Sequence, residues 1–107
     1  MRAEQLKGHL DALLLAVLQS GPLHGYAISE ALRARSSGAF DLPTGTLYPA
    51  LQRLEMAGLI EGAWSEVNGR RRRTYRLTDR GSATLAEERA TWRSFANAVG
   101  SVLGQPA

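Results

Sequence analysis

Two strand-like segments flank the pair Asn68-Gly69. Both residues accept the positive φ angles of a tight two-residue turn, so the pair is the strongest short-range signal for a β-hairpin. We therefore predict antiparallel strands over residues 59–67 and 70–77. In the register that this turn imposes, Trp64 lies opposite Arg73. The hairpin forms one projecting arm, so the rest of the chain has to supply the core.

Helical patterns occupy most of the remaining chain. Apolar residues recur at the spacing of one helix face over residues 6–18, 24–35, 44–57 and 79–103. Gly21-Pro22 ends the first helix, and Thr78 with Asp79 caps the start of the last. Pro49 conflicts with the third pattern, because proline suits only the first turn of a helix. Either the regular helix begins near Thr46 or one backbone hydrogen bond is lost.

The order helix, helix, helix, hairpin, helix predicts a mainly α fold with a β-hairpin wing, the winged helix-turn-helix arrangement. We predict a winged helix-turn-helix DNA-binding domain over residues 1–78, followed by a C-terminal dimerisation helix and tail over 79–107. Both parts form one compact unit, since 107 residues are one domain's length. His24-Gly25-Tyr26 is expected to supply turn and cap chemistry at the start of the second helix.

The composition argues against an enzyme. There are no cysteines, which excludes disulfides, thiolate nucleophiles and Cys-ligated zinc. The two histidines fall in different helices without an acidic cluster, so we expect no metal site. No serine has triad support and no glycine-rich phosphate loop is present, so we expect no catalytic residues and no cofactor. The longest apolar run, residues 12–18, is too short to cross a bilayer, and the first residues lack signal-peptide order. We therefore expect a soluble cytoplasmic protein with no membrane partner.

Positive charge is concentrated on the predicted hairpin. The whole chain has a net charge of +3, and residues 64–81 hold six arginines against two acids, which gives +4. The remainder of the chain therefore sums to −1. Four of the arginines are consecutive: Arg70, Arg71, Arg72 and Arg73. Such a run could be a solvated strand edge, but like charges repel, and a polyanionic partner explains the run more economically.

The third predicted helix has a polar face opposite its leucines. That face carries Thr44, Thr46, Tyr48, Gln52 and Arg53. Thr and Gln can form hydrogen bonds with phosphates or base edges, and Arg can donate two hydrogen bonds to one guanine. Tyr can donate to a phosphate or pack on a thymine methyl group. An ordinary solvated helix face is the alternative. Beside the arginine run we interpret these residues as DNA contacts, with the helix in the major groove and the wing on adjacent backbone.

The last predicted helix carries apolar residues at heptad a and d positions, interrupted by Glu88. They are Leu85, Trp92, Phe95, Val99 and Val102. Such a stripe is typical of a dimer seam, because a lone subunit would expose a large apolar patch. For Trp92 and Phe95, a stacking surface for a flat ligand is the second interpretation.

Several motifs in this sequence are similar to those of the PadR family of bacterial transcriptional regulators. In chain order they are Leu6-Lys7-Gly8, Gly21 to Tyr26, Gly45 to Leu51, Arg53-Leu54-Glu55, Gly58-Leu59-Ile60, Gly69-Arg70-Arg71, Tyr75 to Thr78, and Gly81. The resemblance covers nearly the whole chain, and the length matches the short subgroup with a single C-terminal helix.

The resemblance implies a homodimer joined through the C-terminal and first helices, which adds Leu10 and Leu14 to the predicted interface. It implies a repressor that binds an operator in double-stranded DNA, an inverted repeat to match the dimer, and that a small molecule releases. In some short members an aromatic residue at the position of Trp92 lines a ligand space, so a small aromatic effector is expected near Trp92 and Phe95. Two other functions stay open: a winged-helix module that binds a protein partner, and a non-specific binder of RNA or other polyanions.

Overall fold

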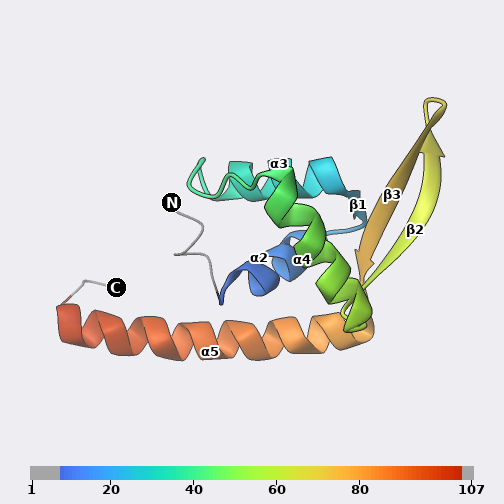
Figure 1. Ribbon diagram of the computed structural model, residues 1–107. Helices are drawn as coiled ribbons and strands as arrows, with labels where there is room; N and C mark the ends of the chain where they lie inside the picture. Colours follow the sequence, from blue (N-terminus) through green and yellow to red (C-terminus); the bar gives the residue numbers. More distant parts are fainter. Residues whose placement is uncertain (1–7, 105–107) are drawn as a thin grey trace.

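The computed structural model describes residues 8–104 and confirms the predicted order of elements (Figure 1). The helices are α2 (Leu10–Leu18), α3 (Gly25–Arg35), α4 (Thr44–Met56) and α5 (Asp79–Leu103). The strands are β1 (Leu23–His24), β2 (Ile60–Val67) and β3 (Arg70–Leu77). The predicted helix over residues 6–18 is present from Leu10, whereas residues 6 and 7 and the tail at 105–107 lie outside the described residues. The fold is therefore a winged helix-turn-helix with a long C-terminal helix.

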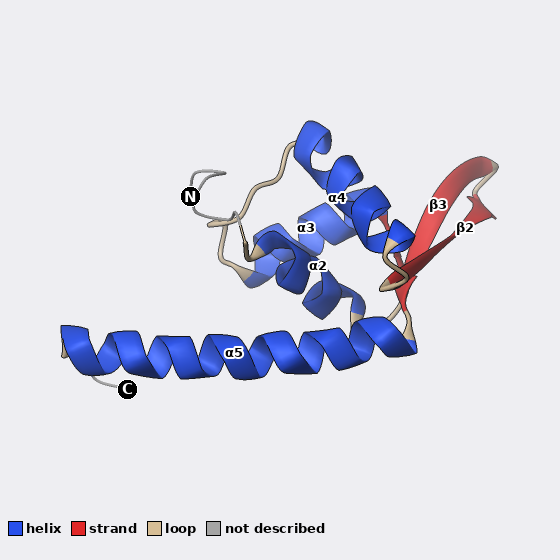
Figure 2. Ribbon diagram, turned by 60° about the horizontal axis from the view of Figure 1, so that its bottom comes forward, coloured by secondary structure: helices blue, strands red, loops and turns tan. Residues whose placement is uncertain are grey.

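Three helices form the body, and two elements project from it. Helices α2, α3 and α4 pack together, β2 and β3 form a hairpin at one side, and α5 runs along the outside of α2 (Figures 1 and 2). Helix α5 continues past the body, which gives the molecule a longest dimension of 54 Å against 28 and 21 Å. Within residues 8–104, no helix combines the length and apolar character needed to cross a membrane.

The core is built mainly from the leucines that the helical spacing identified. Leu14 of α2 and Leu51 of α4 are fully buried, and Ile28 of α3 packs with them. Leu85 of α5 joins the same core with 2% of its surface exposed. The sequence placed Leu14 and Leu85 at a dimer interface, and this was wrong for both. Their side chains are enclosed by their own chain, because the first turns of α5 lie directly on α2.

The sheet contains one strand more than predicted. Its order is β1-β3-β2, and both pairings are antiparallel. Trp64 pairs with Arg73 as predicted, and the turn residues Asn68 and Gly69 have φ angles of 53° and 75°. Strand β1 pairs Leu23 with Tyr75 and so ties the start of α3 to the hairpin. A two-residue strand is too short to show a periodicity, so no pattern of residues predicts it.

Local chemistry sets the starts of α3 and α4. The Nδ1 atom of His24 accepts the backbone N–H of Ala27 at 3.3 Å, which confirms the predicted cap of α3. Helix α4 begins at Thr44, with the Pro43 carbonyl accepting the N–H groups of Thr46 and Leu47. Pro49 therefore lies inside the helix, so the regular helix does not begin near Thr46. The other predicted alternative holds, and the helix lacks one backbone hydrogen bond because proline has no N–H group.

The start of α5 meets the end of α4 at a tight joint. Thr78 Oγ1 accepts the N–H of Gly81 at 3.0 Å, as predicted for a cap, and donates to the Gly58 carbonyl at 2.7 Å. The N–H of Thr78 also bonds to the Leu59 carbonyl at 3.2 Å. Gly81 is buried so closely against this loop that a Cβ there would collide with the Leu59 carbonyl oxygen.

This packing makes Gly81→Ala destabilising. We expect the free energy of unfolding, measured by urea denaturation, to fall by about 1–3 kcal/mol, the usual cost of overpacking. Gly45→Ala is the matched control, because Gly45 is also helical and a Cβ there meets no atom within 4 Å. The control should hold its stability or gain up to about 1 kcal/mol from improved helix propensity. Equal effects of the two substitutions would contradict the close packing at Gly81.

Candidate nucleic-acid interface

Helix α4 exposes most of the polar face that the sequence assigned to DNA. Thr44, Gln52 and Arg53 are exposed, Tyr48 is 45% exposed, and Thr46 is half-buried. These side chains are available along the helix, but they do not share one direction. Tyr48 and Arg53, five residues apart, lie about 140° apart around the helix axis.

The two sides of this face contact different parts of the protein. Tyr48 lies over the start of α3, and a Cβ at Gly25 would stand 2.6 Å from the Tyr48 hydroxyl oxygen. Arg53 turns the other way and donates to the Asp11 carboxylate of α2 at 2.6 Å. Arg53 is thus held toward α2, whereas Tyr48 faces the start of α3.

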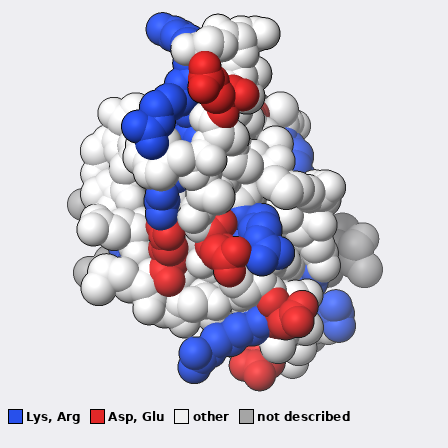
Figure 3. All heavy atoms as spheres, turned by 90° about the vertical axis from the view of Figure 1, so that its right-hand side faces the viewer, with Lys and Arg blue, Asp and Glu red and all other residues white. Residues whose placement is uncertain are grey.

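Two arginines of β3 form ion pairs within the protein, one of them in the run Arg70 to Arg73 and one beyond it. Arg73 forms an ion pair with Glu55 of α4 at 2.5 Å, and both side chains are about two-thirds buried, with 31% and 30% exposed. Arg76, further along β3, pairs with Glu61 across the hairpin at 2.8 Å. Seen from the wing side, blue basic and red acidic side chains lie next to one another down the surface (Figure 3). The wing is therefore a patterned surface rather than a uniform basic patch.

Two arginines near the hairpin turn differ from this pattern. Arg70 and Arg71 are exposed, and no carboxylate or imidazole among residues 8–104 forms a pair with either of them. The Arg71 guanidinium stacks over the Trp64 ring at 4.9 Å from its centroid. Trp64 is itself 59% exposed. Arg71 lies on a rigid aromatic surface with its donors open to solvent.

At the base of the wing, one face of β3 is buried. Tyr75 is 6% exposed and packs into the core, and Leu77 packs against it from the same face. Burial raises the pKa of the Tyr75 phenol, while the nearby Arg73 guanidinium opposes the rise. The phenol therefore stays neutral at physiological pH, and the base of the hairpin is an apolar anchor.

His24 has two partners that demand opposite tautomers. Its Nδ1 accepts from the Ala27 N–H, while its Nε2 lies 2.7 Å from Nη1 of Arg72, which only donates. A neutral imidazole has one acceptor nitrogen, so it satisfies one of these donors at a time. The sequence indicated the cap, but the link between His24 and the wing depends on β1 pairing with β3 and has no local signal.

The predicted interface residues of α5 remain mostly uncovered. Trp92 and Phe95 are 56% and 57% exposed, Val102 is 87% exposed, and Val99 is half-buried. The Trp92 and Phe95 rings lie 5.9 Å apart, and the ring of His9 meets Trp92 edge-on at 5.6 Å. Leu10 is half-buried and packs against the core. The structure thus brings an aromatic cluster together between α2 and α5.

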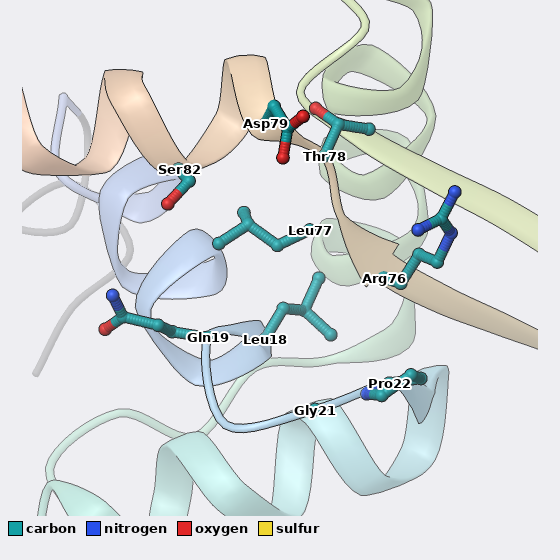
Figure 4. A pocket seen from close by; sticks show the side chains of 9 residues that line it. All are labelled: Leu18, Gln19, Gly21, Pro22, Arg76, Leu77, Thr78, Asp79 and Ser82. Atoms are coloured by element: carbon teal, nitrogen blue, oxygen red, sulfur yellow. The ribbon is translucent and has the colours of Figure 1, made fainter.

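A pocket of about 330 Å³ lies at the joint between the body and α5 (Figure 4). Leu18 and Leu77 supply apolar lining, and Arg76, Thr78 and Asp79 supply polar lining. The Arg76 guanidinium is paired with Glu61, and Thr78 Oγ1 already makes both of its hydrogen bonds. In residues 8–104 no group of three His, Asp or Glu side chains is placed to hold a metal ion.

Comparison with known proteins agrees with this architecture. A family model described as the transcriptional regulator PadR-like family matches residues 14–87. A transcriptional regulator of Mycobacterium tuberculosis is 39% identical over 77 residues, which cover 72% of this chain and 69% of that protein. An uncharacterised protein of Lysinibacillus sphaericus is 34% identical over 93 residues, with 86% and 85% covered.

Solved structures give the same result. A PadR family transcriptional regulator from Eggerthella lenta superposes with a TM-score of 0.81 at 33% identity, covering 96% of this chain and 88% of that chain. A transcriptional regulator from Clostridium thermocellum gives a TM-score of 0.85 at 27% identity, covering 92% and 97%. The protein therefore belongs to the PadR-like family of transcriptional regulators, and it is a DNA-binding regulator rather than an enzyme.

Proposed function

We propose that the protein is a dimeric repressor. In this proposal α4 enters the major groove of an inverted-repeat operator, the wing follows the adjacent backbone, and a small aromatic molecule bound between the subunits releases the DNA. The base contacts come from Thr44, Thr46, Tyr48 and Gln52, and the phosphate contacts come from Arg70 and Arg71. Arg53 and Arg72 are already bound to Asp11 and His24, so they reach the DNA only by leaving these partners.

The observation that carries the proposal is the relation between α4 and the wing. Both diverge from the joint at Gly58 and Leu59, and both project to the same side of the molecule (Figures 1 and 2). A helix is about 10–12 Å across, and the major groove is about 12 Å wide. The exposed face of α4 and the open Arg71 guanidinium can therefore meet a base edge and a phosphate of one duplex.

Selection of duplexes from a random-sequence pool tests the operator, together with protection mapping of the DNA upstream of the protein's own gene. A repressor should protect a short symmetric site, with an affinity that falls steeply as salt increases. Equal binding to any duplex or RNA would favour the polyanion binder. No binding at low salt would favour the module that binds a protein partner.

The C-terminal half of α5 supports the dimer. From Ala86 to Val102 nearly every side chain is exposed, including the large apolar ones on one face. A large contiguous apolar patch is unusual on a monomer. A second copy related by two-fold symmetry would cover both helices with the same surface.

Light scattering at micromolar concentration should therefore give twice the chain mass of 11.6 kDa. Val102→Glu should shift the mass toward the monomer, because it places a charge on the exposed apolar face. Ser101→Glu adds the same charge about 100° around the helix and should leave the dimer intact. A monomeric parent protein, or equal dissociation by both variants, would refute the proposed interface.

The wing and α4 should affect DNA binding differently. Arg71→Ala should weaken binding to all duplexes and reduce the slope of log affinity against log salt by about one unit. Gln52→Ala should mainly weaken binding to the selected duplex, by about 1–3 kcal/mol if the contact is to a base edge. The affinities of both variants, measured for several duplexes and at several salt concentrations, test this difference. Identical profiles for the two substitutions would contradict the assignment.

The cluster of Trp92, Phe95 and His9 supports the effector site. Two copies of Trp92 brought near a two-fold axis would flank one space, where a flat ligand gains about 0.5–1.5 kcal/mol per aromatic pair beyond area burial. Release then requires that the ligand bind more tightly to a dimer whose two α4 helices no longer match successive grooves.

Titration with a series of planar aromatic compounds should quench tryptophan emission at this site. The parent protein and Trp64→Phe should both respond, because each keeps Trp92. Trp92→Ala retains only Trp64 as an emitter and should not respond. If no compound quenches the parent, or if quenching persists in Trp92→Ala, the effector site is wrong while the DNA-binding assignment is unaffected.

A further inference from the structure

Glu55, near the C-terminal end of α4, has two contacts with the hairpin. Its Oε2 lies 2.5 Å from Nη2 of Arg73 on β3 and accepts the backbone N–H of Gly62 on β2 at 3.3 Å. A single carboxylate thus bridges the recognition helix to both strands of the wing. Both partners of the ion pair are largely removed from solvent, so each one needs the other to offset its desolvation.

The shape of the sheet is adapted to this contact. The Arg73 guanidinium lies across β2 over Gly62, and a Cβ at Gly62 would stand 2.8 Å from the Arg73 Nε atom. The side chain therefore folds back toward α4 instead of extending into solvent. Glycine in a strand interior weakens the strand and often marks a close approach, and here the approaching group is this guanidinium.

The contact continues outward along the same face of the wing. The Arg73 guanidinium lies 5.6 Å from the centroid of Trp64 and 5.9 Å from that of Tyr75. The Arg71 guanidinium also stacks on Trp64, at 4.9 Å from the ring centroid. A continuous row therefore runs from Glu55 through Arg73 and Trp64 to Arg71, the exposed cation of this face.

We propose that Glu55 and Arg73 are positioning residues that fix the angle between the wing and α4 and thereby set where Arg71 meets the DNA backbone. Arg73 is then not a phosphate ligand, although it belongs to the arginine run. The effect on DNA rests on the function proposed above, whereas the effect on the angle does not. Backbone contacts set the register of a protein on the duplex, so a loosened wing costs affinity mainly for the preferred sequence.

The hairpin supplies a matched control. Glu61 pairs with Arg76 on the same two strands, but this exposed pair lies within the sheet and does not reach α4. Glu55→Gln and Glu61→Gln each remove one negative charge and would raise the general attraction to DNA alike. Any difference between them reports the position of the wing. Gly62→Ala is a third variant, which displaces the Arg73 guanidinium without changing any charge.

The first measurement uses the protein without DNA. Because the chain has no cysteine, spin labels can be placed at Thr44→Cys on α4 and Val67→Cys on the wing. Labelled protein is mixed with an excess of unlabelled protein, so that nearly every labelled dimer carries only one labelled chain. The distance distribution should be narrow in the parent and in Glu61→Gln, and broader or shifted in Glu55→Gln and Gly62→Ala. An unchanged distribution in Glu55→Gln would overturn the proposal.

The second measurement compares binding to the duplex selected by the parent with binding to a scrambled duplex. Glu55→Gln should lose about tenfold on the selected duplex, the size expected for one good base contact, and nothing on the scrambled one. Glu61→Gln should lose nothing on either. Equal losses in both variants would overturn the positioning role. If the parent selects no duplex, the proposed function fails, and the label distances still decide whether Glu55 holds the wing.

Discussion

The hydrogen bonds of Thr78 determine how the main parts of this protein sit relative to one another. Its hydroxyl group joins the loop that ends α4 to the first turn of α5, and its backbone N–H bonds to the same loop. The body, the wing and α5 therefore meet at one residue. Gly81 allows the helix to approach because it has no side chain to hold the loop away. The end of α4 and the start of α5 are thus joined by the same few atoms.

Some of the arginines on the wing bind side chains of the helices, so the wing is not a uniformly basic surface. The sequence concentrates positive charge there, but the fold matches Arg73 with a carboxylate of α4 and Arg72 with an imidazole at the start of α3. Each pairing connects the hairpin to a different helix. The arginine run thus has two physical roles, since its inner members attach the wing to the body and its outer members, Arg70 and Arg71, stay exposed. A count of charges along the chain cannot separate these roles.

Local signals predicted the elements, while contacts between distant segments required the structure. The Asn68-Gly69 turn and the Thr78 cap depend on residues a few positions apart, so the hairpin register and the start of α5 followed from the sequence. Strand β1 at Leu23, the bridge from Glu55 and the burial of Leu85 depend on how the elements pack. Heptad spacing identified Leu85 as apolar and inward-facing, but it could not distinguish the core of one chain from the surface of another.

The attachment of α5 has a mechanical consequence. The buried contacts of the helix with the body lie in its first turns, at Gly81 and Leu85. Further along, α5 touches the body through exposed contacts, namely the hydrogen bond from Arg89 to Gln19 and the edge-on contact of Trp92 with His9. Beyond Leu85 it extends for roughly 27 Å at about 1.5 Å per residue. A tilt of about 5° at the anchored end therefore displaces the far end by roughly 2 Å, enough to change which side chains oppose each other there. Leu18, Leu77 and Asp79 line the pocket beside the start of α5. A small change in how these side chains pack would therefore tilt the helix slightly and move its C-terminal end much further.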